Sequence, residues 1–347
     1  MAATQSDRGG NLAVRRLHPG YLAMVMATGI ISTATQLFNY MWLSNLLLAV
    51  GVVAYAVLVV LYLWRLVAYT PDFMADLRAP QKGFAFFTFV AASNVLAIRL
   101  EVAHVWAASL PLWYAAIIAW LLLTYVIPAN LIFSQVKVPL GKAVNATWLI
   151  WVVGTQSVTA ATATVVMHEP RYAETLATLG VSFWAFGAML YLVVISLVMV
   201  RLFFHELQPA DLAAPYWINM GATAITVIAG GRLLLLPATL KTLLLFRPFI
   251  TGFCFMLWAW GTWWIPMLVW MGIWRHVIRR FPLEYEPTLW SMVFPLGMYA
   301  ASSTTFGRAT GLTFLVNIAR WEVWAAVLAW LLVLLGLAGS WIRRPRT

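Results

Sequence analysis

The sequence predicts an all-α integral membrane protein, and three observations lead to this class. First, 63% of the 347 residues are hydrophobic and only 10% are charged, whereas soluble domains are about half apolar and a quarter charged. Second, apolar stretches of about 20 residues, the length of a membrane-crossing helix, recur along the whole chain. Third, the basic residues behind the net charge of +11 lie between these stretches. No solvated basic face is therefore expected, which excludes nucleic acid as a partner.

Ten apolar stretches are predicted to cross the membrane as helices. They lie at residues 19–38, 44–64, 83–100, 111–133, 143–166, 179–203, 215–233, 247–274, 288–307 and 322–342. Residues 1–18 are expected to form a leader, 19–342 a ten-helix transmembrane domain and 343–347 a basic tail. No convincing cleavage site follows the first stretch, so we interpret it as a membrane span and not as a signal peptide. The eighth stretch is long enough to require tilt or to protrude.

The distribution of Lys and Arg predicts the orientation. With ten spans, both ends of the chain lie on one side of the membrane. That side carries 15 of the 22 basic residues and the other side carries 7. Because the richer side faces the cytoplasm in most membrane proteins, both termini are predicted to be cytoplasmic, in a multi-pass protein of the cell membrane.

Groups that carry chemistry are missing from the predicted membrane interior. The eleven acidic residues and five histidines are all expected in loops or at span ends. No paired-histidine metal motif or phosphate-binding glycine loop is present, and Cys254 is expected to be a small buried hydrophobe. We therefore expect no cofactor and no enzyme activity. A membrane enzyme or an assembly scaffold stays as an alternative of a different class, and a bound cofactor in the purified protein would favour it.

Small and neutral polar residues gather in the odd-numbered spans, whereas the even-numbered spans are richer in Leu, Val, Ile and Trp. One interpretation is helix packing, in which small residues allow close approach and hydroxyls and amides bond across helices. The other is that the odd helices line a path and the even helices face lipid. The candidates for lining residues are Thr28, Gly29, Asn94, Gln156, Asn219 and Gly221.

The charges on the predicted outer side favour anions as the solute. Basic residues outnumber acidic ones there, and Arg99, Arg232 and Arg308 are the candidate mouth charges. A positive field concentrates anions, and an acid-free interior lacks the carboxylate rings that cation channels use.

The ninth span carries Phe294 beside Pro295. Proline removes one helical hydrogen bond and bends the helix, and a bend at membrane depth is tolerated where it lines a cavity or is buried in protein. Two interpretations stand: a ring directed into a path as a plug, or a core Phe beside a packing kink.

Several segments, in order, resemble the tellurite-resistance/dicarboxylate transporter family. This family includes the bacterial tellurite-resistance protein, fungal malate and sulfite transporters and plant slow anion channels. The matching segments are HPGYLAMVMATGI, SNVLAIRL, WLIWVVGTQSV, YWINMGATAIT, TWWIPMLVWMGIWRH and WSMVFPLGMYA.

The resemblance implies five helical hairpins in a quasi-five-fold bundle, with the odd helices around a central pore and one pore in each protomer of a homotrimer. It implies transport of small anions such as malate, succinate, chloride, nitrate or sulfite, and it makes any tellurite phenotype a side effect of that transport. It makes Phe294 the pore gate, with Ala23 opposite it where the bacterial pattern has Gly. The alternative with the same fold is a proton-coupled C4-dicarboxylate carrier or a sulfite or tellurite exporter.

Overall fold

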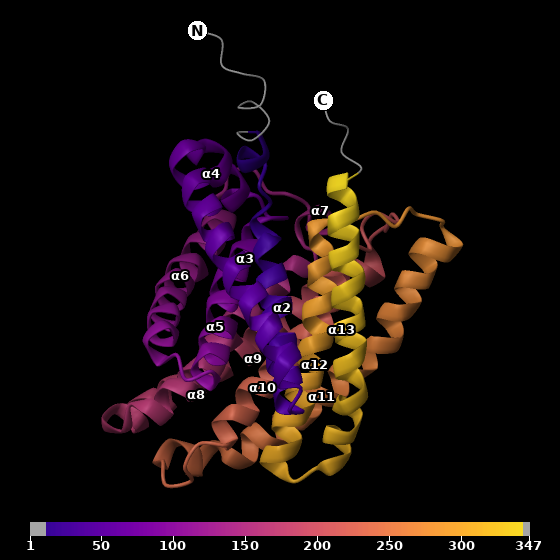
Figure 1. The fold of residues 1–347 in the computed structure, drawn as a ribbon. Coiled ribbons are helices and arrows are strands. Elements are labelled where there is room, and N and C mark those ends of the chain that lie inside the picture. The colour runs from indigo at the N-terminus through magenta and orange to yellow at the C-terminus, as the bar shows by residue number, and fades with distance from the viewer. Residues whose placement is uncertain (1–11, 343–347) are drawn as a thin grey trace.

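The computed structural model describes residues 12–342, and over this range the chain is helical without strands (Figure 1). The predicted tail 343–347 and residues 1–11 of the predicted leader lie outside the described residues. The long helices, in chain order, are α2 (Ala23–Leu37), α3 (Met41–Ala68), α5 (Phe87–Val102), α6 (Trp106–Phe133), α8 (Leu149–His168), α9 (Ala173–Phe204), α10 (Ile218–Leu234), α11 (Lys241–Ile273), α12 (Trp290–Thr310) and α13 (Thr313–Ile342). Two short helices, α4 (Thr70–Arg78) and α7 (Leu140–Ala143), lie in connections.

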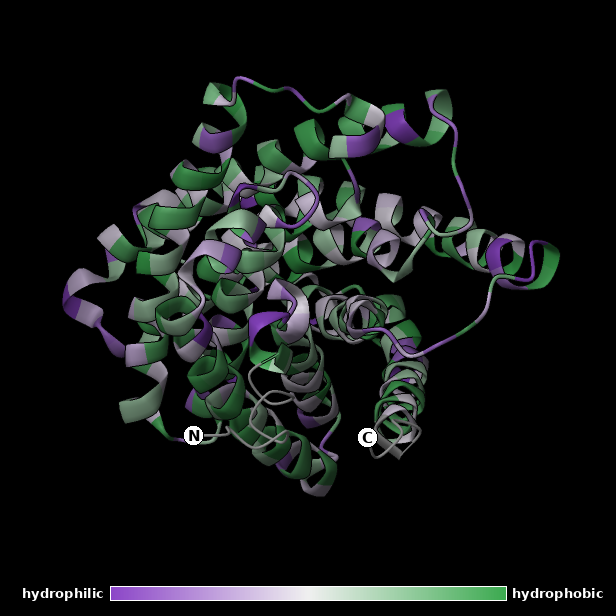
Figure 2. Ribbon diagram, turned by 90° about the horizontal axis from the view of Figure 1, so that it is seen from above, coloured by the Kyte–Doolittle hydropathy of each residue, from purple (hydrophilic) through white to green (hydrophobic). Residues whose placement is uncertain are grey.

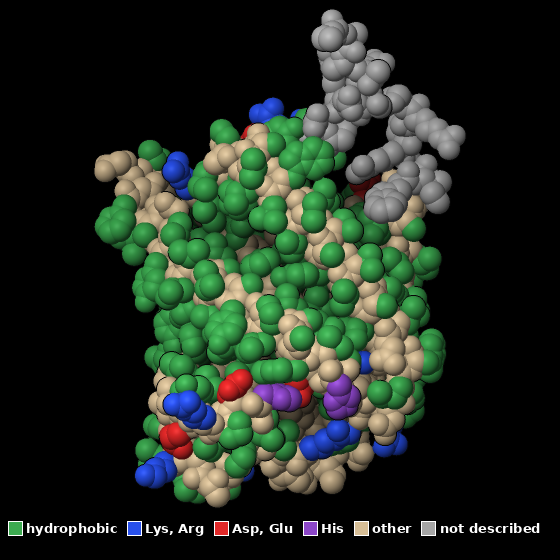
Figure 3. Space-filling model, turned by 60° about the vertical axis from the view of Figure 1, so that its left-hand side comes forward, with side chains coloured by type: hydrophobic (Ala, Val, Ile, Leu, Met, Phe, Trp, Pro, Cys, Tyr) green, Lys and Arg blue, Asp and Glu red, His purple; other side chains and the backbone are tan. Residues whose placement is uncertain are grey.

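Seven helical segments of the described chain are long and apolar enough to cross a membrane. They are Met41–Ala68, Gly83–Val102, Trp106–Phe133, Ala146–His168, Pro170–Phe204, Lys241–Ile278 and Thr313–Ser340. Apolar side chains cover the middle of the molecule, charged side chains lie toward its two ends, and the histidine side chains in view lie at the lower end (Figure 3). Seen from above, hydrophilic residues lie mainly in the connections (Figure 2). The molecule is therefore an integral membrane protein of helices.

The helices form an inner and an outer set. The inner helices α2, α5, α8, α10 and α12 contact one another in that cyclic order, since α12 also packs against α2. Each is followed along the chain by an outer helix that packs on it: α3, α6, α9, α11 or α13. In the most apolar stretch of Ala146–His168, which contains inner helix α8, 94% of the residues are buried. In the corresponding stretch of Met41–Ala68, which is outer helix α3, only 17% are buried. The inner set thus forms the core, and the outer set presents its Leu and Val side chains outward.

Each inner helix begins with a 3₁₀ turn at the same end of the bundle. The turns are η1 (Pro19–Leu22), η2 (Gly83–Phe86), η3 (Ala146–Trp148), η5 (Ala214–Trp217) and η7 (Pro287–Leu289). They touch their neighbours in the cyclic order of the helices. The five inner helices therefore run in one direction.

Polar side chains of the outer helices bond each hairpin to the next inner helix. Tyr55 of α3 bonds Ser93 of α5. The other bonds are donated by tryptophan side chains: Trp113 and Trp120 of α6 donate to Thr162 and Thr155 of α8, and Trp184 of α9 donates to the Thr226 carbonyl of α10. In the same way, Trp258 of α11 donates to Ser303 of α12, and Trp330 of α13 donates to Thr28 of α2. The distances range from 2.7 to 3.1 Å. Many inner-helix hydroxyls therefore serve packing between hairpins, as polar groups commonly do between membrane helices.

Four outer helices begin well before the predicted apolar stretches, at Trp106, Ala173, Lys241 and Thr313. Hydropathy marks only the apolar part of a helix, whereas backbone hydrogen bonding continues past it. Because α13 begins at Thr313, Glu322 lies inside this helix, where it is half-buried. This position differs from the expectation that every acidic residue lies in a loop or at a span end.

A charge cluster fixes the end of the bundle where α3, α4 and η2 meet. Asp76 of α4 accepts hydrogen bonds from Arg65 of α3 at 2.6 Å and from Lys82 at 2.9 Å. The Arg65 side chain is only 3% exposed. Burial alone would raise the pKa of Asp76, but the bonds from Lys82 and Arg65 outweigh it and hold this pKa below its ordinary value.

Asp76→Asn is expected to lower the free energy of unfolding by about 3 kcal/mol at pH 7, because it leaves the buried Arg65 without its carboxylate. A carboxyl with a depressed pKa stabilises the fold above its unfolded pKa of about 3.9 and loses that contribution as the pH falls through its folded pKa. The gap in melting temperature between wild type and variant should therefore be full at pH 6–8 and close below about pH 4. Asp72→Asn is the control, since its partner Arg15 is 55% exposed and the pair contributes about 0–1 kcal/mol. Equal losses in both variants would contradict the assignment.

Candidate functional site

A narrow cavity lies on the axis enclosed by the inner helices. All five inner helices contribute to its wall, which consists of Ile30, Thr33, Val95, Ile98, Ser157, Ala160, Ile225, Ile228, Arg232 and Met298. The space within it is about 20 Å³, enough for about one water molecule. This conformation therefore has no continuous passage for a dicarboxylate at this depth.

Within residues 12–342, Arg232 is the one charged residue in the wall of this cavity. It lies near the end of α10, half-buried, and its Nη1 donates to Thr164 of α8 at 3.0 Å. None of the ion pairs among the described residues includes it, and no carboxylate lines the cavity. Glu101 acts on this guanidinium electrostatically without forming an ion pair with it, and the guanidinium faces the cavity.

Phe294 lies one helical turn before Met298, which lines the cavity. Residues four apart share a helix face, so Phe294 shares the face of α12 that carries Met298. The side chain is 1% exposed. Pro295 lies inside α12 against α10: a Cβ added to Gly221 would be 2.7 Å from its Cγ. The absence of a side chain at Gly221 is what allows α12 to approach α10 so closely.

Ala23 is the first residue of α2 and is 3% exposed. It lies seven residues before Ile30 of the cavity wall and therefore on the same face of α2. The turns that precede α2 and α12 touch each other. Ala23 and Phe294 thus lie near the same end of two neighbouring inner helices.

Two of the predicted lining residues point away from the axis. Thr28 accepts a hydrogen bond from Trp330 of outer helix α13, and Gln156 donates from Nε2 to the Trp184 carbonyl of outer helix α9 at 2.9 Å. A Cβ added to Gly187 of α9 would collide with the Gln156 amide. Both side chains serve helix packing, the first of the two interpretations of these polar residues.

The other predicted lining residues lie between helices. Asn94 donates to Ser157, which does line the cavity, at 3.0 Å. Gly29 allows contact with Val95 of α5, since an added Cβ would lie 2.7 Å from that side chain. Asn219 is fully buried, and neither its amide oxygen nor its nitrogen has a hydrogen-bond partner among the described residues. By the helix period it lies on the face of α10 opposite Ile225 and Ile228.

The remaining two predicted mouth charges differ in exposure. Arg99 is not on the surface: it is 1% exposed, and its guanidinium donates to Ser32, Ser44 and Asn45. Without a carboxylate partner it is held by neutral acceptors, which join α5 to the α2–α3 hairpin. Arg308 is exposed and donates to the Leu37 carbonyl at the end of α2.

Thr33, Ser157 and Thr164 are functional candidates that the sequence analysis did not single out. Thr33 and Ser157 line the cavity, and Thr164 holds Arg232. For Ser157 and Thr164, a signal in the sequence could have indicated the site: their spacing of seven residues places both on one face of α8. Among the described residues, no group of His, Cys, Asp or Glu is arranged to hold a metal ion.

Most of the chain is similar to other membrane proteins, some of which are named as transporters. The profile of the voltage-dependent anion channel family matches residues 16–338. An uncharacterized membrane protein of Mycobacterium tuberculosis is 45% identical over 141 residues, which are 41% of this chain and 71% of that protein. An uncharacterized transporter of Methanocaldococcus jannaschii is 25% identical over 93% of this chain and 94% of its own length. A sulfite efflux pump of Candida albicans is 24% identical over 85% of this chain and 67% of its own. These matches confirm the resemblance seen in the sequence segments, and the chain belongs to the voltage-dependent anion channel family.

Proposed function

We propose that this protein is a pathway for small anions across the cell membrane, closed at rest by Phe294. The observation that carries the proposal is the wall of the axial cavity, to which all five inner helices contribute and in which Arg232 is the only charged residue among those that the structure describes. A path that offers one cation, two hydroxyls and no carboxylate stabilises an anion and repels cations.

The topology proposed for this function has ten membrane-crossing helices in five hairpins, arranged quasi-five-fold around the pore. The cyclic contacts of the inner helices and of their 3₁₀ turns support it. On this proposal α2, α10 and α12 also cross the membrane, although they are less apolar, because protein and not lipid surrounds them. The excess of Lys and Arg on one side supports cytoplasmic termini, with residues 1–18 as leader and 343–347 as tail.

The gate in this proposal is the ring of Phe294 packed on the face of α2 that carries Ala23. The absence of a large side chain at Ala23 leaves room for the ring, and a rotamer change of Phe294 opens the path. Thr33, Ser157 and Arg232 then meet the anion beyond the gate. Asn94 positions Ser157 through its hydrogen bond.

The solutes proposed are C4-dicarboxylates such as malate and succinate, or inorganic anions such as chloride, nitrate and sulfite. The similarity to a sulfite efflux pump supports sulfite as one candidate. By analogy with the family, the assembly is a homotrimer with a pore in each protomer, and tellurite resistance would be a side effect of anion movement.

A proton-coupled carrier is the second candidate, and one ion pair favours it. His168 at the end of α8 lies 2.9 Å from Glu101 near the end of α5, and Trp106 stacks on the histidine ring. A titratable pair at the ends of two neighbouring inner helices is placed to couple transport to external pH.

Uptake of labelled malate and sulfite into liposomes, with and without an imposed pH gradient, distinguishes the two candidates. The channel proposal predicts uptake that follows the anion gradient and keeps the same pH response in Glu101→Gln. Uptake that requires the pH gradient, and loses this requirement in Glu101→Gln, would replace the channel with the carrier. Glu169→Gln, a carboxylate at the same end without an ion pair among the described residues, is the matched control.

A further inference from the structure

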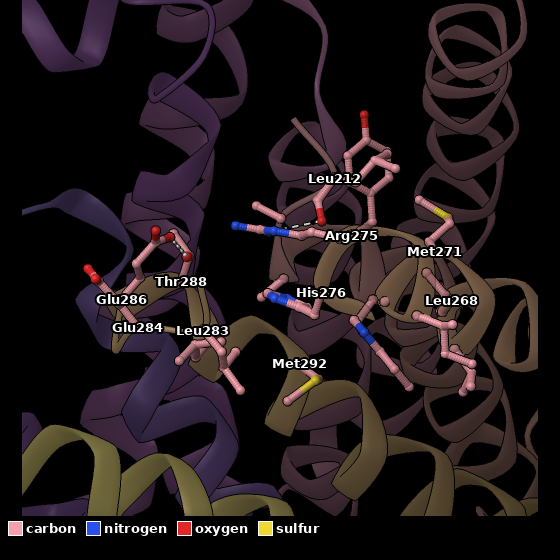
Figure 4. A pocket seen from close by; sticks show the side chains of 18 of the residues that line it. Leu212, Leu268, Met271, Arg275, His276, Leu283, Glu284, Glu286, Thr288 and Met292 are labelled. Atoms are coloured by element: carbon pink, nitrogen blue, oxygen red, sulfur yellow. Dashed lines mark hydrogen bonds between the residues drawn. The ribbon is translucent and has the colours of Figure 1, made fainter. Parts of the chain in front are cut away.

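A pocket of about 430 Å³ lies outside the axial path, between the end of α11 and the start of α12 (Figure 4). Earlier along α11, Trp258 and Thr262 bond Ser303 and Tyr299 of α12. From Leu268 onward α11 lines the pocket instead. The helix then continues as a π-helical turn, Trp274–Ile278, an irregularity that is frequent at functional sites.

Most of the pocket wall is apolar. Leu212, Leu268, Met271 and Met292 surround its interior (Figure 4). At its rim Val277 is 67% and Leu283 is 74% exposed, although both are large hydrophobic residues. An exposed apolar rim around an apolar interior suits a ligand with a hydrocarbon chain and disfavours a soluble ion.

One wall of the pocket carries a buried cation with an unused donor. Arg275 is 7% exposed, and its Nη1 donates to the Leu212 carbonyl at 2.9 Å. Its Nε is buried and has no hydrogen-bond partner in the described part of the chain. The guanidinium lies over the Phe281 ring at 4.5 Å and takes part in none of the ion pairs of the described chain. A buried donor without an acceptor is costly, and an anionic ligand group in the pocket would satisfy it.

The facing wall carries two carboxylates. Figure 4 shows Glu284 and Glu286 across the pocket from Arg275 and His276. Glu286 accepts from Thr288 at 3.2 Å, and Glu284 is exposed. The pocket therefore presents a positive and a negative side above an apolar interior.

A bilayer centred on the middle of this helical segment would place Arg275 in its headgroup region. The segment Lys241–Ile278 has 38 residues, and Arg275 lies about 23 Å from its middle at 1.5 Å per residue. The headgroups of a bilayer about 40–45 Å thick lie at about this distance from the centre once the helix is tilted.

We propose that this pocket binds phosphatidylethanolamine from the adjacent leaflet. The phosphate would accept from Arg275, the ammonium would donate to Glu284 and Glu286, and an acyl chain would lie on the apolar wall. An anionic lipid leaves the two carboxylates without a counter-charge, and a choline headgroup has no N–H to donate to them. The proposal does not depend on the transported solute.

Retention of lipid by the purified full-length protein tests the proposal. The protein is incubated in detergent with dioleoyl phosphatidylethanolamine, the corresponding phosphatidylglycerol or the phosphatidylcholine, and bound lipids are counted by native mass spectrometry. Phosphatidylethanolamine should be retained about threefold or more over both other lipids. Glu284→Gln with Glu286→Gln should remove this preference over phosphatidylglycerol, and Arg275→Gln should lower the retention of both lipids about threefold or more, which corresponds to about 0.7 kcal/mol or more.

Arg279→Gln is the matched control, because Arg279 lies four residues further on, is exposed and does not line the pocket. It should retain lipid as the wild type does. Should Arg275→Gln fail to fold, the glutamate variants at the exposed wall decide the question. Equal retention of the three lipids, a preference for phosphatidylglycerol, or full competition by inorganic phosphate would overturn the proposal. The proposal would also be overturned if Leu283→Glu dissociated an oligomer without loss of lipid, because the pocket would then be a contact between copies of the chain.

Discussion

Phe294→Ala is expected to raise anion current through the reconstituted protein about hundredfold or more over the wild type. A ring on the axis forces a passing anion to shed its water, which costs several kcal/mol, and each 1.4 kcal/mol removed from a barrier raises the rate tenfold. With the ring gone, the axial cavity of about 20 Å³ is expected to connect with the end of the bundle where α2 and α12 begin. Currents in planar bilayers under chloride, nitrate and malate gradients measure this change.

Phe306→Ala is the matched control for the gate. It makes the same truncation on the same helix, at a residue that is also fully buried. Twelve residues separate it from Phe294, which rotates it about 120° around the helix, and its backbone lies against Gly231 of α10. This variant should lose about 3–5 kcal/mol of stability without gaining current. Equal currents in the two variants would show that general loosening, and not removal of a gate, opens the protein.

Arg232→Gln, placed in the Phe294→Ala background, is expected to reduce the anion current about tenfold and to weaken the preference for anions over cations. A unit charge 4 Å from an ion contributes about 4 kcal/mol at an effective dielectric constant of 20. Water in the opened path lowers this contribution, so about 1.4 kcal/mol, or tenfold, is a conservative value. Arg232→Lys should preserve the preference because the positive charge remains.

Arg308→Gln is the corresponding control, since Arg308 belongs to the same end of the inner helices but is exposed and does not line the cavity. Its loss should change the current by less than about twofold, because salt screens exposed charges over about 8–10 Å. A tenfold loss in Arg308→Gln, or unchanged selectivity in Arg232→Gln, would remove Arg232 from the site.

The sequence predicts the class of the fold well because the membrane imposes simple demands. Hydropathy and length locate the helices, and the alternation between small polar residues and large apolar residues separates the inner from the outer helices. The 3₁₀ turns before all five inner helices were missed, although Pro, Asn or Gly occurs near each of them. Their local sequences differ too much to be recognised as a repeat.

The candidate site was predicted less completely, because a polar residue in the middle of a helix has two possible uses. Thr28 and Gln156 looked equally suited to a pore, but tryptophan residues of the outer helices supply their partners. Which face of an inner helix meets the axis depends on its rotation within the ring, and the rotation is set by contacts between distant segments such as Gly221 with Pro295. Arg99 illustrates the same limit, since Ser32 and Ser44 from the first hairpin surround a guanidinium that was expected at the surface.

The most direct test of an anion pathway through the inner helices is the reversal potential of Phe294→Ala in a planar bilayer under a potassium chloride gradient. The proposal predicts current well above that of the wild type, reversing near the chloride equilibrium potential. Reversal near the potassium equilibrium potential, or no current above wild type from folded protein, would contradict it.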